Sequence, residues 1–357
     1  MGRESPAHRH WLDLPEKSAI ERPSSRACSP SDLQAGYRDI STAIMDQSGT
    51  ELLAPDAAGI TRASELLRGG RLVAVPTETV YGLAARADSD AAVASIYRAK
   101  GRPDFNPLIV HVASRELAES LAVLDSRARE LADRFWPGPL TMVLPLREDA
   151  QIAPAVTAGL PTIALRMPAH PAMQALLAQT GLPLAAPSAN RSGAVSPTDA
   201  GHVVASLGGR IDAVVDGGAC ERGLESTIVA LRADGTWQLL RPGPIEESRI
   251  SAILGRPHDV TSAKVEAPGQ LAQHYSPGKP LRLEAQDSAS DEFMIGFGDV
   301  AGDCTLSASG DLAEAAARLY ACLHLAAASS KPRIAVAKLP HDGIGAAIGD
   351  RLARAAA

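Results

Sequence analysis

The sequence RLVAVPTETVYGLAARADSDAAVASIYRAKGRPDFNPLIVHV occupies residues 71–112 and contains the pattern that decides the fold. Arg71–Val75 is short and mostly apolar, and it predicts a strand that ends where a proline follows. Residues 89–99 predict a helix, because capping residues precede them and Gly101 lies beyond their end. Leu108–Val112 predicts the next strand. Strands interleaved with helices predict an α/β fold.

The same alternation extends outward from this unit. A helix at 61–68 precedes it, and a hairpin turned at Asp234-Gly235 follows later in the chain. A hairpin pairs antiparallel strands, so the sheet is predicted to be mixed rather than purely parallel. The other expected strands are 140–145, 162–167, 184–186, 211–215, 226–232 and 236–240, and the other expected helices are 114–122, 126–135, 170–179, 198–207 and 246–254.

The length of 357 residues predicts two domains. Residues 1–55 mix serine, proline and charged residues without sustained periodicity, and they predict a disordered extension in which Met45 is a candidate start. Residues 56–254 form the expected first domain. Residues 255–280 are rich in glycine, proline and polar residues and predict a linker, and residues 281–357 predict a small α/β domain. Its expected elements are strands 281–284, 293–297 and 333–337 and helices 311–328 and 343–355.

The composition excludes several classes of protein. A net charge of −6, with only 4 Phe, 3 Trp and 5 Tyr, argues against a general grip on nucleic acid, so no stable nucleic-acid binding is expected. No apolar run is long enough to span a membrane and no secretory signal is recognisable, so we expect a cytoplasmic protein that does not bind membranes. The 4 cysteines form no C-x-x-C pair and are expected to be reduced. Neither a P-loop nor a dinucleotide-binding glycine pattern occurs.

Polar segments after the first two strands are candidates for chemistry. Residues 76–83 place two threonine hydroxyls and a carboxylate after a strand, which suits either a ligand-binding loop or a capped structural turn. Lys100 and Arg102 lie where a helix ends, so they either complement the helix dipole or bind an anion. His111 lies on the following strand, where a lone histidine is more often structural than functional.

A second group of candidates lies further along the chain. Period-two alternation places Arg166 on the polar face of strand 162–167, where it needs a carboxylate of the protein or an anionic group of a ligand. Residues 186–198 bring small residues, hydroxyls and an amide behind a strand, and Arg241 adds another guanidinium. If these cations converge, they form a positive cavity for a small polyanion in an acidic protein.

The ordered motifs resemble the threonylcarbamoyl-AMP synthase family, which has a YrdC-like domain. They are PTETVYGL at 76–83, KGRP at 100–103, ALRMP at 164–168, PSAN at 187–190, ESTI at 225–228 and RPG at 241–243. The linker APGQLAQHYSP at 267–277 and the motifs within 339–352 resemble the longer, two-domain members, and the resemblance covers residues 58–357. It implies an α/β fold with a YrdC-like twisted mixed sheet and helices around a concave positive cavity, plus a small Rossmann-like C-terminal α/β domain.

The resemblance implies an L-threonylcarbamoyladenylate synthase, which is a nucleotidyltransferase. Such an enzyme condenses L-threonine, bicarbonate or CO2, and ATP to threonylcarbamoyl-AMP and pyrophosphate, for threonylcarbamoyladenosine modification of tRNA. It also implies Mg²⁺ accompanying ATP, and tRNA threonylcarbamoyl transferase proteins as downstream partners. The alternative is an RNA-binding module of the same fold without turnover, which the acidic charge and the few aromatic residues disfavour.

The resemblance also implies a role for each matching residue. Lys100, Arg102 and Arg166 are the implied catalytic residues, with Arg166 pairing the carboxylate of threonine. The implied threonine site consists of Thr79, His111, Arg166, Ala186 and Ser226, and the implied ATP site consists of Arg102, Asn106, Thr162, Ser188, Asn190, Ser196 and Arg241. His274 and Tyr275 are expected to cover the mouth of the cavity as a lid, the alternative being an ordinary spacer.

Overall fold

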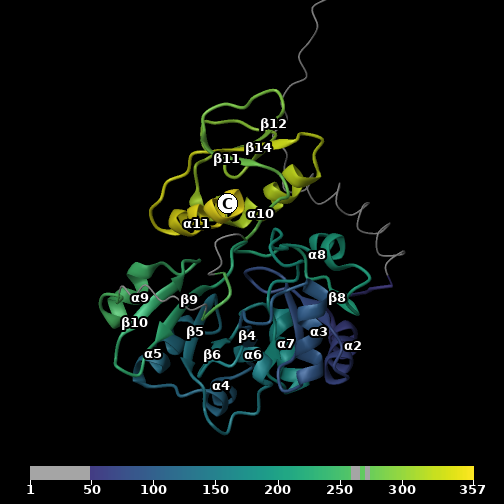
Figure 1. Cartoon of the computed structure of the whole chain (residues 1–357), viewed down its shortest axis with the longest axis vertical. Coiled ribbons are helices and arrows are strands. Elements are labelled where there is room, and N and C mark those ends of the chain that lie inside the picture. Colours follow the sequence, from purple (N-terminus) through teal and green to yellow (C-terminus); the bar gives the residue numbers. More distant parts are fainter. Residues whose placement is uncertain (1–48, 259–265, 270–273) are drawn as a thin grey trace, which may run out of the picture.

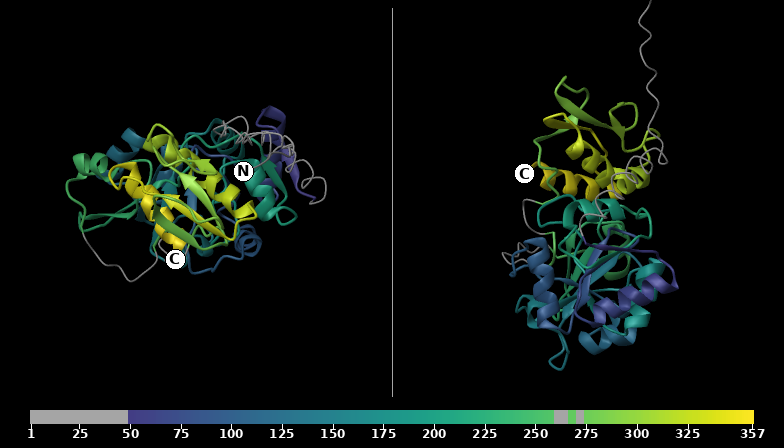
Figure 2. Two further views of the ribbon diagram at one scale, coloured as in Figure 1. Left: turned by 90° about the horizontal axis from the view of Figure 1, so that it is seen from above. Right: turned by 90° about the vertical axis from the view of Figure 1, so that its right-hand side faces the viewer.

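The computed structural model of the chain describes residues 49–258, 266–269 and 274–357. These residues form a larger domain around a ten-stranded sheet and a smaller domain around a four-stranded sheet. The smaller domain, yellow in the figures, lies over one end of the larger domain in Figure 1 and in the side view of Figure 2. The predicted mixed α/β fold with a separate C-terminal α/β domain is confirmed. Most of the predicted extension and parts of the predicted linker lie outside the described residues.

The large sheet is mixed, as the hairpin predicted. Strand β2 pairs parallel with β8 on one side and antiparallel with β3 on the other. In spatial order the strands are β1 (Glu51–Leu53), β8 (Ala213–Val215), β2 (Val73–Val75), β3 (Gly82–Arg86), β7 (Leu184–Ala185), β4 (Ile109–His111), β6 (Thr162–Arg166), β5 (Leu140–Pro145), β9 (Thr227–Leu231) and β10 (Trp237–Arg241).

Helices cover both faces of this sheet around β2. The side chain of Ala74 packs into the largest apolar cluster, which includes residues of α3 and α5, while Val73 and Val75 pack against α2 and α7 on the opposite face. Alternation along the strand therefore buries both faces, as period two requires. The helices of this domain are α2 (Ala57–Arg68), α3 (Asp90–Lys100), α4 (Arg115–Leu121), α5 (Ser126–Phe135), α6 (Pro154–Thr157), α7 (Pro171–Thr180), α8 (Ala200–Leu207) and α9 (Glu247–Leu254).

Helix α3 positions the predicted cation loop. The Ser89 side chain accepts a hydrogen bond from the backbone N–H of Ala92, which caps the start of the helix. Gly101 has φ +61° and ends the helix in the left-handed conformation, which glycine adopts without steric cost. The chain leaves the helix directly into Arg102, so the cap fixes where that guanidinium begins.

The C-terminal domain is a small parallel sheet packed on two helices. Its strands are β11 (Leu281–Ala285), β14 (Arg333–Ala337), β12 (Glu292–Gly296) and β13 (Cys304–Thr305) in spatial order, and its helices are α10 (Leu312–Ala328) and α11 (Ile344–Ala356). Each neighbouring strand pair is parallel. The parallel pairing agrees with the expected Rossmann-like arrangement.

The two domains share an apolar interface. Val80, Val195 and Leu224 of the first domain are buried in the same cluster as residues of α10 and α11. At Gly223, a Cβ would lie 2.5 Å from the backbone oxygen of Ala316 in α10, so a side chain there would collide with the helix. The backbones of the two domains therefore approach closely at this point.

Three expectations from the sequence are corrected. Residues 51–53 form β1, which pairs with β8, so the ordered domain begins before the predicted boundary at residue 55. Residues 82–86 form β3, whereas the sequence predicted a loop or turn at 76–83 and no strand after it. The sulfur atoms of Cys304 and Cys322 are joined in a disulfide, whereas all cysteines were expected to be reduced. The disulfide could not be predicted, because the spacing of the cysteines does not show that β13, which carries Cys304, lies beside α10, which carries Cys322.

Candidate active site

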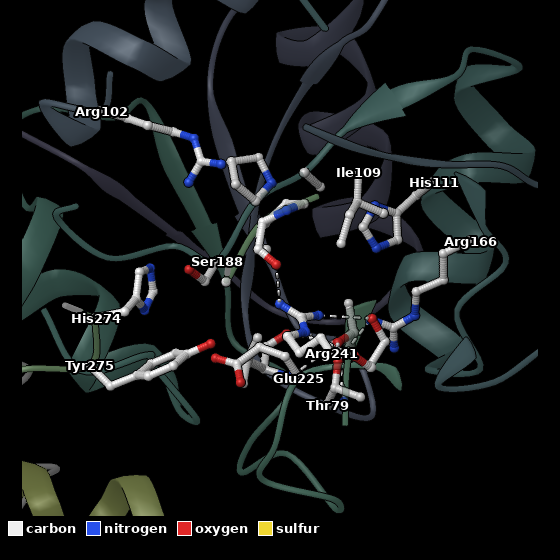
Figure 3. Close-up of a pocket in the computed structure, with 18 residues that line it drawn as sticks. Thr79, Arg102, Ile109, His111, Arg166, Ser188, Glu225, Arg241, His274 and Tyr275 are labelled. Carbon is white, nitrogen blue, oxygen red and sulfur yellow. Dashed lines mark hydrogen bonds between the residues drawn. The ribbon is translucent and has the colours of Figure 1, made fainter. Parts of the chain in front are cut away.

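A cavity lies on the face of the large sheet that the linker crosses (Figure 3). On this face, β4, β6, β5 and β9 carry a small apolar cluster that is completed by Ala267 of the linker. The lining includes Thr79, Arg102, His111, Arg166, Ala186, Ser188, Ser226, Arg241, His274 and Tyr275, all predicted from the sequence. It also includes Thr77, Val80, Gly82, Ile109, Pro187, Glu225, Pro268 and Gly269.

The loop after β2 is ordered by its own hydroxyl groups. The Oγ1 atoms of Thr77 and Thr79 are 2.8 Å apart, and the Thr77 hydroxyl donates to the carbonyl of Val80 at 2.7 Å. Backbone N–H groups of Thr79 and Val80 donate back to the Thr77 hydroxyl at 3.2 Å. The loop is thus a capped turn that also faces the cavity, and ligand binding by it stays a prediction.

Arg166 has a carboxylate of the protein as its partner. Its Nη2 donates to Oε1 of Glu78 at 2.6 Å, and its Nη1 donates to the Thr79 hydroxyl at 2.9 Å. Burial, the largest single effect, acts to raise the pKa of Glu78, but the charge and hydrogen bond of Arg166 and backbone hydrogen bonds together lower that pKa below its usual value. The pair is therefore ionised and close to neutral in sum, with both side chains almost fully buried.

His111 lies beside Arg166 in the neighbouring strand, in direct register. Its ring is buried, and neither ring nitrogen has a hydrogen-bond partner in the part of the chain that the structure describes. Burial, helped by the charge of Arg166, lowers the pKa of His111 well below its usual value. The imidazole is therefore neutral at pH 7 and has a nitrogen lone pair available to a ligand in the cavity.

Two other guanidinium groups reach the cavity without forming an ion pair among the described residues. Arg102 donates to the carbonyl of Pro107 at 3.1 Å, and Arg241 donates to the carbonyl and hydroxyl oxygens of Ser226, each at 3.1 Å. Burial lowers the pKa of Arg102 to about 10 and lowers that of Arg241 as well. Both still carry their positive charge at pH 7, and their bonds to neutral oxygens leave that charge for an anion.

Lys100 has a different environment from the one predicted. Its ammonium group donates to the carbonyls of Ser188 and Asn190, at 2.6 and 2.5 Å, and it does not line the cavity formed by the described residues. Burial, followed by the charge of Arg102, lowers its pKa well below the usual value. In this structure Lys100 binds the loop at residues 188–190, and its role toward phosphate or carbamate stays a prediction.

Four other predicted site residues lie outside the lining. Ser196 donates through its hydroxyl to Oε1 of Glu225 at 2.6 Å, so it sits one layer behind the cavity. The amide of Asn190 donates to the carbonyls of Arg191 and Ala194, which shapes the same loop. Asn106 is buried beside Arg102, and Thr162 begins β6. None of these four residues lines the cavity that the described residues form.

The linker closes one side of the cavity. Tyr275 is 1% exposed, and its ring meets that of His274 edge-on at 4.1 Å. Burial lowers the pKa of His274 to about 3, so this ring is neutral at pH 7. Gly269 has φ +88°, and a Cβ there would lie 2.9 Å from Cδ of Arg241, so the linker touches the cavity wall where only glycine fits.

Glu225 is the charged side chain in the lining of the cavity that sequence reasoning did not select. It lies in the motif ESTI, where a carboxylate next to two hydroxyls gave no reason to prefer it over a turn residue. Figure 3 shows its carboxylate inside the cavity, pointing toward the hydroxyl end of Tyr275. Thr77 was noticed only as part of its motif, and Gly269 only as part of the linker.

The chain matches two protein families in succession. The family described as "Telomere recombination" (Sua5/YciO/YrdC) matches residues 65–243, and the family described as "Threonylcarbamoyl-AMP synthase, C-terminal domain" matches residues 245–357. Together these matches span both domains. No helix among the described residues is long and apolar enough to cross a membrane.

Curated relatives carry the same name in several organisms. The chain is 48% identical over 240 residues to the threonylcarbamoyl-AMP synthase of Bacillus subtilis, covering 66% of this chain and 69% of that protein. It is 46% identical over 225 residues to the Pyrococcus abyssi enzyme, covering 60% of this chain and 64% of that protein. It is 39% identical over 272 residues to the Schizosaccharomyces pombe enzyme, covering 67% of this chain and 66% of that protein.

A solved structure agrees with the whole arrangement. The crystal structure of P. abyssi Sua5 complexed with L-threonine superposes with a TM-score of 0.78 at 35% identity, covering 86% of this chain and 97% of that one. The match therefore extends through the C-terminal domain as well as the large sheet.

Proposed function

Because the chain belongs to the two-domain threonylcarbamoyl-AMP synthase family, we propose that its cavity joins L-threonine, bicarbonate or CO2, and ATP into threonylcarbamoyl-AMP and pyrophosphate. The relatives' names support an enzyme, a nucleotidyltransferase acting in tRNA modification, over the RNA-binding module considered as the alternative. The observation that carries the proposal is the cavity itself. Its unpaired guanidinium groups suit a polyanion, and its neutral polar end suits an amino acid.

The neutral end fits threonine. The ring of His111 can accept a hydrogen bond from the amine, since its nitrogens have no partner among the described residues. Arg166 can bind the carboxylate through donors that Glu78 does not occupy, because a guanidinium has five N–H groups. The hydroxyls of Thr79 and Ser226 and the small side chain of Ala186 complete the proposed pocket.

The cationic part fits ATP. Arg102 and Arg241 would bind the nucleotide, and Ser188 lines the same cavity, on the side of His274 in Figure 3. Ser196, Asn190, Asn106 and Thr162 would act through the loops they hold. Lys100 would act in the same way, since its bonds to the carbonyls of Ser188 and Asn190 fix the loop that faces the nucleotide.

The chemistry needs no nucleophile from the protein. The amine of threonine forms a C–N bond to CO2 and loses a proton, and one oxygen of the resulting carbamate attacks the α-phosphorus of ATP. The bond from that phosphorus to the bridging oxygen breaks, and pyrophosphate leaves with the electron pair. Positioning of the reactants, together with guanidinium groups near the phosphoryl oxygens, supplies the catalysis.

The residues present do not fit a metal ion held by the protein alone. Among the described residues, no group of three or more His, Cys, Asp and Glu side chains could hold one. Glu78 and Glu225, the carboxylates at the cavity, already bind Arg166 and Arg351. We therefore propose that Mg²⁺ arrives on the phosphates of ATP, as part of the substrate.

The linker is proposed to act as a lid. Tyr275 and His274 cover the cavity beside Arg241, and a covered cavity protects the carbamate and the adenylate from water. The product would pass to tRNA threonylcarbamoyl transferase proteins in the cytoplasm, with no membrane and no stable nucleic-acid complex required.

The proposal is tested by turnover. Purified protein is incubated with MgATP, bicarbonate and L-threonine, and the products are separated by chromatography and identified by mass. Threonylcarbamoyl-AMP and pyrophosphate should appear together, and neither should form when threonine is omitted. Pyrophosphate release that does not depend on threonine, or the absence of the adenylate, would contradict the proposed function.

A further inference from the structure

Glu225 binds the C-terminal domain from within the cavity of the first domain. Its Oε2 accepts hydrogen bonds from the hydroxyl of Tyr320 in α10 and from Nε of Arg351 in α11, each at 2.8 Å. Its Oε1 accepts the hydroxyl of Ser196 at 2.6 Å. Tyr320 and Arg351 are both 0% exposed. One carboxylate of the cavity is therefore held by two side chains of the other domain.

Arg351 is fixed in this place from several sides. Its Nη2 donates to the carbonyl of Pro242 at 2.9 Å, and its Nη1 donates to Asp350 at 2.7 Å. Its guanidinium carbon lies 5.5 Å from the ring centre of Tyr275 in the linker. The same cation thus contacts the cavity wall, the linker and its own helix.

The charge of Glu225 matters because Arg241 is its neighbour in the cavity. Burial acts to raise the pKa of Glu225, but the charges of Arg351 and then Arg241 outweigh it and lower that pKa to about 2. The carboxylate is thus ionised at pH 7, and it makes no ion pair with Arg241 among the described residues. A buried carboxylate without Arg351 would turn to the nearest remaining cation or take up a proton.

We propose that Arg351 is a positioning residue for the reaction: it binds Glu225 from the C-terminal domain and so leaves the charge of Arg241 to the nucleotide. The proposal rests on the proposed function for the identity of the ligand. Arg351 touches no substrate in this account. Its effect on the nucleotide passes through the Glu225 carboxylate, and the C-terminal domain thereby completes the charge balance of the cavity.

A double-mutant cycle on the full-length chain tests the proposal. The variants are Arg351→Met, Glu225→Gln and both together, and the control is Arg333→Met, which removes an exposed ion pair with Asp291 in the same domain. Calorimetry measures the affinity for α,β-methylene-ATP with Mg²⁺ and, separately, for L-threonine. Arg351→Met should weaken binding of the analogue at least about tenfold, the scale of an uncompensated buried charge, and threonine binding less than about threefold.

The double variant gives the decisive comparison. With a neutral amide at 225, Arg241 has no competing carboxylate, so the analogue's affinity should return to within about threefold of wild type. If Arg351 had a purely structural role, Arg351→Met would lose affinity equally for the ATP analogue and for threonine, and the double variant would not recover it. Equal losses, or a double variant no better than Arg351→Met, would overturn the proposal.

The proposal can still be tested if Arg351→Met does not fold. In that case the decision passes to Arg351→Lys, which keeps the charge, and to the double variant, both of which should bind the analogue within about threefold of wild type. Weaker binding in both would overturn the proposal. Because binding is measured without turnover, a wild type that binds the analogue but makes no threonylcarbamoyl-AMP would contradict the proposed function alone.

Discussion

The positively charged residues in and around the cavity differ in their hydrogen-bond partners and in whether they line it. Arg166 is paired with Glu78, and Lys100 lies outside the lining of the cavity, so neither presents an unpaired charge to the cavity formed by the described residues. Arg102 and Arg241 bind only neutral oxygens of the protein. Buried guanidinium groups whose partners are neutral favour the binding of a phosphate, because the phosphate provides the negative charge that their protein partners lack.

Replacing Arg102 tests this difference directly. Arg102→Gln should weaken binding of the ATP analogue by about tenfold and leave threonine binding nearly unchanged, because one charge-assisted contact is lost on the nucleotide side only. Calorimetry with each ligand provides the measurement. Arg98→Gln is the matched control, since Arg98 lies in α3, just before the loop of Arg102, and donates to the hydroxyl of Ser95 at an exposed position. Equal losses for ATP and threonine would contradict the assignment.

The chemistry of individual residues was enough to predict the arginines of the cavity from the sequence. Contacts between residues far apart in the chain could not be predicted in this way. Strand alternation alone places Arg166 on a polar face and predicts either a carboxylate of the protein or an anionic ligand group beside it, and Glu78 is such a carboxylate. Lys100 was expected to face a ligand, because the sequence does not show that the loop at 188–190 folds over its ammonium group. Glu225 was passed over, since its partner Arg351 lies 126 residues further along the chain.

At the scale of elements, periodic segments were predicted closely and short ones were not. The helix predicted at 126–135 is α5, and the strand predicted at 140–145 is β5, because each has an apolar pattern of several residues. Strand β3 is made of GLAAR, whose small side chains show no alternation. Strand β1 has three residues, and its pairing with β8 depends on contacts more than 150 residues apart.

Strand β1 gives a prediction about where the chain can be shortened. A chain that starts at Met45 should keep the melting temperature of the full protein, because β1 and its ion pair between Glu51 and Arg62 remain. A chain that starts at residue 56 loses β1 and should melt several degrees lower. Thermal unfolding followed by circular dichroism is the measurement. Equal melting temperatures for both shortened chains would show that β1 contributes little.

Helices α8 and α10 bring two histidines together between the domains. The rings of His202 and His324 stack with centroids 3.7 Å apart, and Nε2 of His324 lies 3.1 Å from the carbonyl of Ser196. Burial lowers the pKa of each to about 3, from the usual 6.5. The pKa of the neighbouring Asp199 is raised by burial, so its carboxylate offers less compensation in acid.

This stack predicts a pH dependence of stability. Below pH 6.5 the unfolded chain binds protons that the folded histidines do not, so stability should fall as the pH falls from 7 toward 5, by on the order of 1–2 kcal/mol for each histidine. Thermal melts across this range should show a shallower slope for His324→Gln. The exposed His341→Gln serves as the control and should keep the wild-type slope. If stability depended on pH as steeply in His324→Gln as in the wild type, the buried histidines would not be the cause of the pH dependence.

At the scale of the whole molecule, one cavity is built from three parts of the chain. The large sheet supplies Arg166 and His111, the linker supplies Tyr275, and the C-terminal domain holds Glu225 through Arg351. Tyr275 and Tyr320 stack with ring centres 5.6 Å apart, so the linker is fixed by the same domain that holds Glu225. The second domain is thus part of the proposed active site rather than an appended unit.

Ligands should therefore change the accessibility of the linker. Addition of the ATP analogue with Mg²⁺ and threonine should slow chymotryptic cleavage after Tyr275 at least about threefold, because this buried residue is cleaved only when the lid opens. Cleavage is followed by mass spectrometry of timed samples. Sites elsewhere on the surface provide the internal control. A linker cleaved at the same rate with and without ligands would refute the proposed lid.

The bond between Glu225 and Arg351 has a consequence for biosynthesis. The ribosome adds Glu225 to the growing chain 126 residues before Arg351, which at cellular rates is a delay on the order of ten seconds. During that time the large sheet can collapse, but its buried carboxylate has no counter-ion from the later helix. If Arg351 positions Glu225 as proposed, the newly made protein should reach its full affinity for nucleotide only when α11 has docked.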